Sequence, residues 1–189
     1  KGADPVNRKQ EELGTDILEN VRNELYYYFP YLDGAFACIS GKGSEETRTI
    51  GTDGEFFLFS PEYLLELYVK KPEAVRRGYL HMLLHCLYLH LFLENQEDRR
   101  LWNLACDIAV ESIVDSLPGK AVHLVVSDKR NETYDMLRRE LKVLSAEGIY
   151  RVLKEKDLSV QEFGKLQLEY WVDDHVFWEH KKEDDRDQD

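Results

Sequence analysis

The sequence predicts an α+β fold in which a small antiparallel sheet packs on a buried, histidine-bearing helix, with additional helices around them. Several segments repeat apolar residues at a spacing near 3.6. Short segments rich in β formers alternate with turn signals between residues 35 and 59. An apolar run over residues 79–93 holds three histidines. With 189 residues, 43% of them hydrophobic, the chain can bury the core of one domain, which we place at residues 1–180, with a charged tail or linker at 181–189.

A helix and three strands are expected first. Residues 11–29 have helical periodicity and stop at Pro30, and the aromatic run 26–31 should pack this helix end on the core. Short β-forming segments follow at residues 35–40, 47–51 and 55–59. Thr52-Asp-Gly54 is typical of a hairpin turn. The strand at 55–59 would then border a cleft, where it is suited to pair with an extended peptide.

Helices are expected over most of the remaining chain. Ser60-Pro-Glu62 combines a capping hydroxyl, a proline in the first turn and an acid near the positive helix end. Pro72-Glu73 opens the histidine helix, which we expect to reach about Leu93. Further helices are predicted at residues 101–117 and 145–153, and a strand at 121–126.

The composition limits which classes of partner the chain can bind and indicates its cellular compartment. A net charge of -12 argues against binding to a nucleic-acid backbone or to an anionic membrane surface. Cys38, Cys86 and Cys106 lie in apolar surroundings without C-x-x-C spacing, so we expect no disulfide framework and a reducing, cytoplasmic location. Cys86 and Cys106 are expected to be small buried residues. The apolar run is too short for a bilayer. The chain begins with Lys1 and ends in a charged tail, so a neighbouring domain is expected to be missing.

The histidine helix carries a candidate metal site. His81 and His85 are one turn apart on one helix face, where two imidazoles can hold one zinc ion. In the signature H-E-x-x-H the residue after the first histidine is a glutamate that takes a proton from metal-bound water, and here it is Met82. On a continuous helix His90 points about 180° from His81, so it should not share the ion. The alternative is a pair of core histidines with ordinary hydrogen-bond partners.

Acids later in the chain are candidate ligands. Asp107 and Glu111 share one face of an apolar helix, where a buried carboxylate needs a partner. Asp107 is therefore a third ligand, or else it caps a neighbouring helix or pairs with an arginine or a histidine. Glu111 and His175 are possible additional site residues. Asp173 and Asp174 could also reach the site, but for Asp173-Asp-His175 we favour a polar turn or a helix start before Trp178 over a site role.

Several ordered motifs resemble a known bacterial family. They are Thr52-Asp-Gly-Glu-Phe-Phe-Leu-Phe-Ser-Pro-Glu62, His81-Met-Leu-Leu-His85 and Trp102-Asn-Leu-Ala-Cys-Asp107. In this order they resemble predicted metal-dependent peptidases whose domain precedes a von Willebrand factor A-like domain. That family shows T-D-G, a strand ending in N-P, H-E-x-x-H and W-N-x-A-x-D. Residues 145–150 and 173–178 are also similar to its recurring segments.

The resemblance implies a zincin-like layout in which His81, His85 and Asp107 bind zinc. Met82 replaces the catalytic glutamate, and a positioned base is commonly worth about 10²–10⁴-fold in rate. Ser60 replaces asparagine before Pro61, a milder change because both residues cap helices.

We therefore expect a degenerate zinc metallopeptidase-like domain that binds a peptide or protein with little or no hydrolysis. The alternatives are an active metal-dependent peptidase with a substitute base, and a metal-free interaction module. As partners, the resemblance implies an AAA-type ATPase and a C-terminal von Willebrand factor A-like domain.

Overall fold

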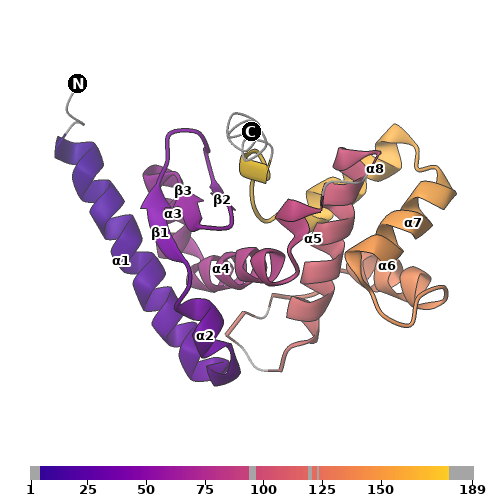
Figure 1. Ribbon diagram of the computed structural model, residues 1–189, viewed down its shortest axis with the longest axis horizontal. Coiled ribbons are helices and arrows are strands. Elements are labelled where there is room, and N and C mark those ends of the chain that lie inside the picture. Colours follow the sequence, from indigo (N-terminus) through magenta and orange to yellow (C-terminus); the bar gives the residue numbers. More distant parts are fainter. Residues whose placement is uncertain (1–4, 94–96, 119–120, 123, 179–189) are drawn as a thin grey trace, which may run out of the picture. The chain divides into compact units, whose positions relative to one another are not determined.

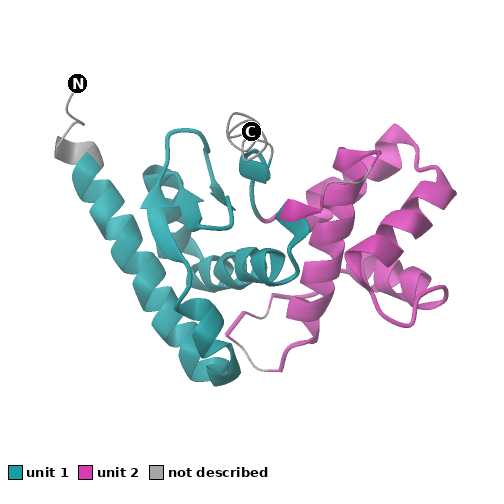
Figure 2. Ribbon diagram, viewed as in Figure 1, with its two compact units in different colours: residues 1–91, 173–189 teal, residues 92–172 magenta. Residues whose placement is uncertain are grey.

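The computed structural model describes residues 5–93, 97–118, 121–122 and 124–178, with side chains from residue 8 onward (Figure 1). Its internal contacts divide the chain into two compact units (Figure 2). Unit 1 comprises residues 1–91 and 173–189, and unit 2 comprises residues 92–172. The predicted domain boundaries stay a prediction, and the predicted tail at 181–189 lies outside the described residues.

Unit 1 combines helices with a small sheet. Its elements are α1 (Pro5–Tyr28), the 3-10 helix η1 (Pro30–Leu32), α2 (Asp33–Phe36), β1 (Ser40–Gly43), β2 (Ile50–Thr52), β3 (Phe56–Phe59), α3 (Pro61–Lys70), α4 (Pro72–Leu87) and the 3-10 helix η2 (His90–Phe92), whose last residue already belongs to unit 2. The predicted helices before residue 70 and the predicted third strand are confirmed. The fold is α+β and mostly helical.

The sheet has the order β1-β3-β2. β2 runs antiparallel to β3, with Ile50 opposite Phe59, but β1 runs parallel to β3, with Ser40 opposite Phe56. The predicted all-antiparallel sheet is therefore wrong for β1, because residues 44–55, which include β2, separate β1 from β3 and let these two strands run in the same direction. β3 is the central strand, and both of its edges pair with neighbouring strands. The prediction that this strand pairs with an extended peptide is therefore wrong, because no edge of β3 is free.

The turn between β2 and β3 forms as predicted. Gly54 adopts a positive φ of 86°, which glycine tolerates at no steric cost. The Asp53 carboxylate accepts hydrogen bonds from the backbone N–H groups of Glu55 and Phe56, at 2.8 and 2.7 Å. After β3, α3 begins at Pro61, but the Ser60 hydroxyl makes no capping hydrogen bond, so this part of the expectation is wrong.

Two expectations near the end of α1 are also wrong. In the segment 35–40 only Ala35 and Phe36 belong to a helix, α2, residues 37–38 form a turn, and the strand starts only at Ser40. In the aromatic run 26–31 only Phe29 is buried, whereas Tyr27 is 82% exposed. The reason is that η1 and α2 turn the chain at Pro30, so that Phe36 and Ile39 supply the buried apolar surface instead.

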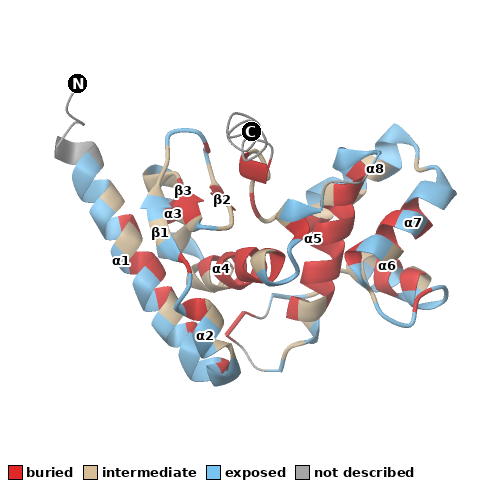
Figure 3. Cartoon of the chain, viewed as in Figure 1, coloured by how far each residue is buried: buried red, intermediate tan, exposed pale blue. Residues whose placement is uncertain are grey.

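α4 lies at the centre of unit 1. Every residue from Arg77 to His85 is buried (Figure 3). α1 and α3 both pack on this helix, and the ring of Tyr79 meets that of Phe57 edge-on at 4.5 Å. The apolar sequence of α4 is explained by this burial on all sides.

α4 ends earlier than predicted. Its last residue is Leu87, and Leu89 adopts a left-handed φ of 57°. The chain then turns into η2, which begins at His90. The expected helix to Leu93 is therefore wrong, because the chain leaves the helix after Leu87 and takes a left-handed conformation at Leu89.

Unit 2 is a group of helices, with α7 and α8 packed on α5. They are α5 (Arg99–Ser116), α6 (Asp128–Arg138), α7 (Ala146–Lys156) and α8 (Val160–Tyr170). α5 and α7 confirm two predicted helices, but α6 and α8 were not predicted. The predicted strand at 121–126 is wrong for 121–122 and 124–126, which form no strand, and residue 123 lies outside the described part.

Each helix of unit 2 begins at a polar cap. Side-chain oxygens of Asp98, Ser127, Ser145 and Ser159 accept hydrogen bonds from the first turn of α5, α6, α7 and α8. Among the described residues, no helix is both long and apolar enough to cross a membrane.

Candidate metal centre

Two histidines of α4 face each other inside unit 1. Their four-residue spacing places both rings on one side of the helix, with ring centroids 4.5 Å apart. Nε2 of His81 lies 2.8 Å from Nε2 of His85. Both side chains are fully buried. The prediction that His81 and His85 share one face of the helix agrees with this geometry.

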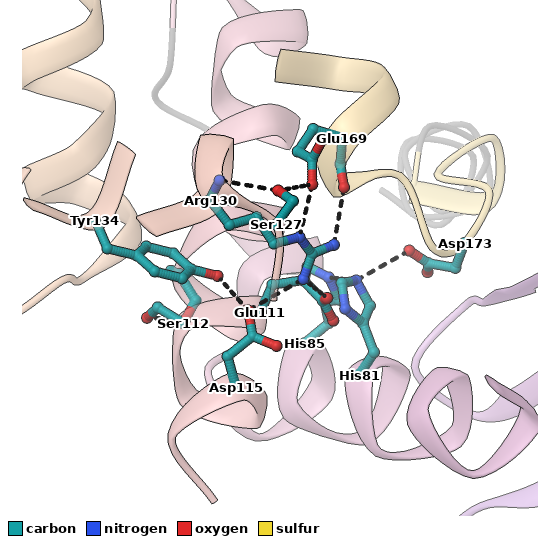
Figure 4. Close-up of polar contacts among 11 residues, drawn as sticks. His81, His85, Glu111, Ser112, Asp115, Ser127, Arg130, Tyr134, Glu169 and Asp173 are labelled. Carbon is teal, nitrogen blue, oxygen red and sulfur yellow. Dashed lines mark hydrogen bonds and ion pairs between the residues drawn. The ribbon is translucent and has the colours of Figure 1, made fainter. Parts of the chain in front are cut away.

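A carboxylate from the other end of unit 1 joins the pair. Oδ1 of Asp173 lies 3.3 Å from Nε2 of His81 (Figure 4). Together, His81, His85 and Asp173 each offer one donor atom, and these atoms lie within 4.8 Å of one another. The convergence of two imidazoles and one carboxylate makes this a candidate metal centre.

The edge of the sheet holds Asp173 in this position. The N–H of Asp174 donates to the carbonyl of Ile50 at 2.7 Å, and Asp174 forms a parallel bridge with Gly51 of β2. The Thr47 hydroxyl donates to Oδ2 of Asp174 at 3.2 Å. Residues 173–178 are thus fastened to β2, more than a hundred residues away in sequence.

The Asp173 carboxylate is buried and incompletely satisfied. Burial acts to raise its pKa, but the neighbouring His175 and His81 outweigh burial and hold the pKa below the usual value. Oδ1 faces both imidazoles. Oδ2 is buried and has no hydrogen-bond partner among the described residues. An unsatisfied carboxylate oxygen at this depth is costly and fits a position that binds a cation.

The spacing of the donors fits a zinc ion. Ligands about 2.0–2.1 Å from a tetrahedral zinc ion lie roughly 3.3 Å apart. The His81–Asp173 distance of 3.3 Å matches that spacing, and the His81–His85 distance of 2.8 Å is somewhat shorter. Two nitrogen donors and one oxygen donor form a set that zinc commonly accepts.

The sequence gives only a weak indication that Asp173 belongs to the site. The sequence favours a polar turn or a helix start over a site role for residues 173–175, and the structure places the Asp173 carboxylate beside His81. The only local signal was the close sequence of two acids and a histidine before Trp178. His175, an additional candidate, lies beside Asp173, with Nε2 3.1 Å from Oδ1, and stacks on Trp178 at 3.7 Å between ring centroids. It therefore contacts the carboxylate.

The predicted acids of α5 belong to unit 2. Asp107 is buried on this helix, and its role as the third ligand stays a prediction. Glu111, the other candidate, is fully buried and pairs with Nη1 of Arg130 at 2.5 Å. This ion pair gives Glu111 a structural role within unit 2, and its part in a metal site also stays a prediction.

Arg130 joins three helices of unit 2 (Figure 4). Besides Glu111, it contacts Asp115 at 3.1 Å and the side chain of Glu169 at 3.3 Å. Burial acts to lower the pKa of Arg130, but Glu111 and Asp115 raise it above the usual value. The Tyr134 hydroxyl donates to Asp115 at 2.7 Å, and burial raises the pKa of this phenol. We call these five side chains the Arg130 network.

Met82 and the three cysteines can now be placed within their own units. Met82 is buried in α4, where its thioether offers no base for proton transfer. Cys86 is partly buried, with its sulfur 3.7 Å from the Thr52 hydroxyl. Cys106 is buried in α5, as expected, and Cys38 is exposed.

His90 requires a correction. The prediction placed it on the far side of a continuous helix, but the reversal at Leu89 returns it to the histidine pair. Nδ1 of His90 lies 3.0 Å from Nδ1 of His85. It therefore approaches the nitrogen of His85 opposite to the one that faces His81.

Comparisons with known proteins identify the family of the chain. The family described as "Putative metallopeptidase domain" matches residues 20–176. An uncharacterized protein of Thermotoga maritima is 28% identical over 131 residues, which cover 67% of this chain and 32% of the relative. The chain thus spans about a third of that relative's length. No solved structure matches the chain. Since the family match covers most of its residues, the chain belongs to the putative metallopeptidase domain family.

Proposed function

We propose that the chain binds zinc through His81, His85 and Asp173 and hydrolyses peptides slowly or not at all. The observation that carries the proposal is the meeting of two buried imidazole Nε2 atoms with a carboxylate whose second oxygen has no partner among the described residues. On the resemblance alone, we retain Asp107 as a further proposed ligand.

The absence of a glutamate after His81 favours a binding role over hydrolysis. Bound zinc polarises a carbonyl group and lowers the pKa of a coordinated water. A carboxylate that takes the proton is needed beside it, and the residue after His81 is Met82. We therefore propose a degenerate, zincin-like domain that uses its site to bind a peptide or a protein. An AAA-type ATPase in the cytoplasm and a von Willebrand factor A-like domain are the partners that the family resemblance suggests.

Zinc content tests the proposed site. The full chain, purified without a histidine tag and dialysed against buffered zinc, should hold about one zinc ion per chain by elemental analysis. His85→Ala should reduce this content to near zero, because one of the two imidazole ligands is lost.

The matched control is Leu84→Ala, which truncates a buried neighbour on the same helix and should keep the zinc. Circular dichroism should show that both variants remain folded. A wild-type chain that binds no zinc would overturn the proposal and favour the metal-free interaction module.

Restoring the glutamate tests the proposed loss of activity. Met82→Glu should raise hydrolysis of an unfolded protein such as casein by at least about 10²-fold, because the new carboxylate can accept the proton. Met82→Gln has nearly the same shape without a base and should stay as inactive as the wild type. Wild-type hydrolysis equal to that of Met82→Glu would contradict the proposal and point to a substitute base.

A further inference from the structure

We propose that His90 is a positioning residue for the metal centre. It accepts a hydrogen bond from Nδ1–H of His85 and so directs the Nε2 lone pair of His85 to the ion. This inference rests on the proposed function. It concerns neither a ligand nor a base, but the residue that selects the binding tautomer of His85.

Both nitrogens of the His85 ring are engaged. Nε2 lies 2.8 Å from Nε2 of His81, and Nδ1 lies 3.0 Å from Nδ1 of His90. A neutral imidazole has one N–H donor and one acceptor nitrogen. If Nε2 of His85 gives its lone pair to the ion, Nδ1 must carry the proton and donate it. His90 then accepts with Nδ1 and carries its own proton on Nε2.

Because the contact between His85 and His90 is buried, it can control the tautomer of His85. The side chain of His85 is fully buried, and His90 is 5% exposed. Water therefore has little access to replace the partner of Nδ1, and the tautomer of His85 depends on the side chains around it. A metal-binding histidine typically donates its other N–H to such a partner, which fixes both the tautomer and the ring orientation.

A strained backbone brings His90 to this position. On a continued helix, residue 90 would point about 140° away from residue 85. Leu89 instead adopts a φ of 57°, a left-handed conformation that is sterically unfavourable for a non-glycine residue. Its side chain is 57% exposed and gains little by burial. The reversal also stacks the rings of His90 and Tyr88, with an interplanar angle of 21°. Such strain is often retained where it places a functional group.

Two substitutions separate the acceptor from the ring. His90→Phe keeps an aromatic ring for the stack on Tyr88 but removes Nδ1. His90→Asn removes the ring and keeps an acceptor oxygen close to the position of Nδ1. Zinc affinity, measured by competition with a fluorescent chelator, should fall about 10–100-fold in His90→Phe. It should return toward the wild-type value in His90→Asn.

Two further measurements distinguish positioning from simple packing. The visible absorption of the cobalt-substituted protein should change in His90→Phe and return in His90→Asn, because it reports the ligand geometry. The unfolding midpoint of the metal-free chain should be similar in wild type and His90→Phe, since the ring packing is kept. A loss of affinity that only tracked a lower metal-free midpoint would overturn the inference.

The outcomes also separate this inference from the proposed function. A wild-type chain without zinc affinity contradicts the metal site itself. A wild-type chain that binds zinc, with both variants equally tight, contradicts only the role of His90. Equal weakening in both variants would also overturn the inference, because an acceptor at this position would then not be what matters.

Discussion

Arg130→Met is expected to lower the free energy of unfolding of unit 2 by about 3–5 kcal/mol. Arg130 is the cation of the Arg130 network, and it faces Glu111, Asp115 and Glu169 from α6. The side chain of Glu111 is fully buried and that of Asp115 nearly so. Removing the guanidinium leaves these carboxylates close together without a cation, and methionine replaces only the apolar part of the side chain.

The measurement is guanidinium unfolding followed by circular dichroism, with amide hydrogen exchange to locate the change in α5, α6 and α8. Arg138→Met is the matched control on the same helix. Its ion pair with Asp135 is long, at 3.9 Å, and both side chains are mostly exposed, so a loss of about 0–1 kcal/mol is expected.

A second substitution checks the cause of the Arg130 effect. Adding Glu111→Gln to Arg130→Met should recover part of the lost stability, because it removes one of the uncompensated charges. A loss below about 1 kcal/mol in Arg130→Met, or no recovery in the double variant, would show that unit 2 does not depend on this charge balance.

Local sequence signals predicted the part of the site that lies within one helix. The four-residue spacing of His81 and His85 fixes their common face wherever α4 forms. Turn and capping signals were equally informative, as at Gly54 and Ser145. α6 was missed although Ser127 caps it, because its sequence is highly polar and lacks a clear apolar stripe.

Long-range contacts explain what the sequence did not reveal. Asp173 reaches His81 only because residues 173–178 return to the edge of β2, and no periodicity encodes that return. His90 was assigned to the wrong side because a single backbone angle at Leu89 ends the helix. In both cases tertiary packing overrides local preference, and it does so around the candidate metal centre.

Gly51→Ala is expected to displace residues 173–178 and to lower zinc affinity more than about 10-fold. A Cβ atom at Gly51 would lie 2.5 Å from the carbonyl oxygen of Asp174 and 3.0 Å from the ring of Phe177. The first contact is with backbone, so no rotation of a side chain can relieve it. The bridge that holds Asp173 beside His81 must therefore open or shift, with a packing cost of about 1–3 kcal/mol.

Two measurements follow this displacement without relying on activity. Zinc affinity should fall, and the amides of residues 173–178 should exchange faster in the metal-free chain, because the Asp174 N–H loses its acceptor at Ile50. Gly34→Ala is the matched control in unit 1, since a Cβ there meets nothing within 4 Å. Wild-type exchange in Gly51→Ala would mean that β2 does not hold the segment. Faster exchange with unchanged zinc affinity would instead show that the ion does not need Asp173, and would leave the histidines to bind it with other ligands.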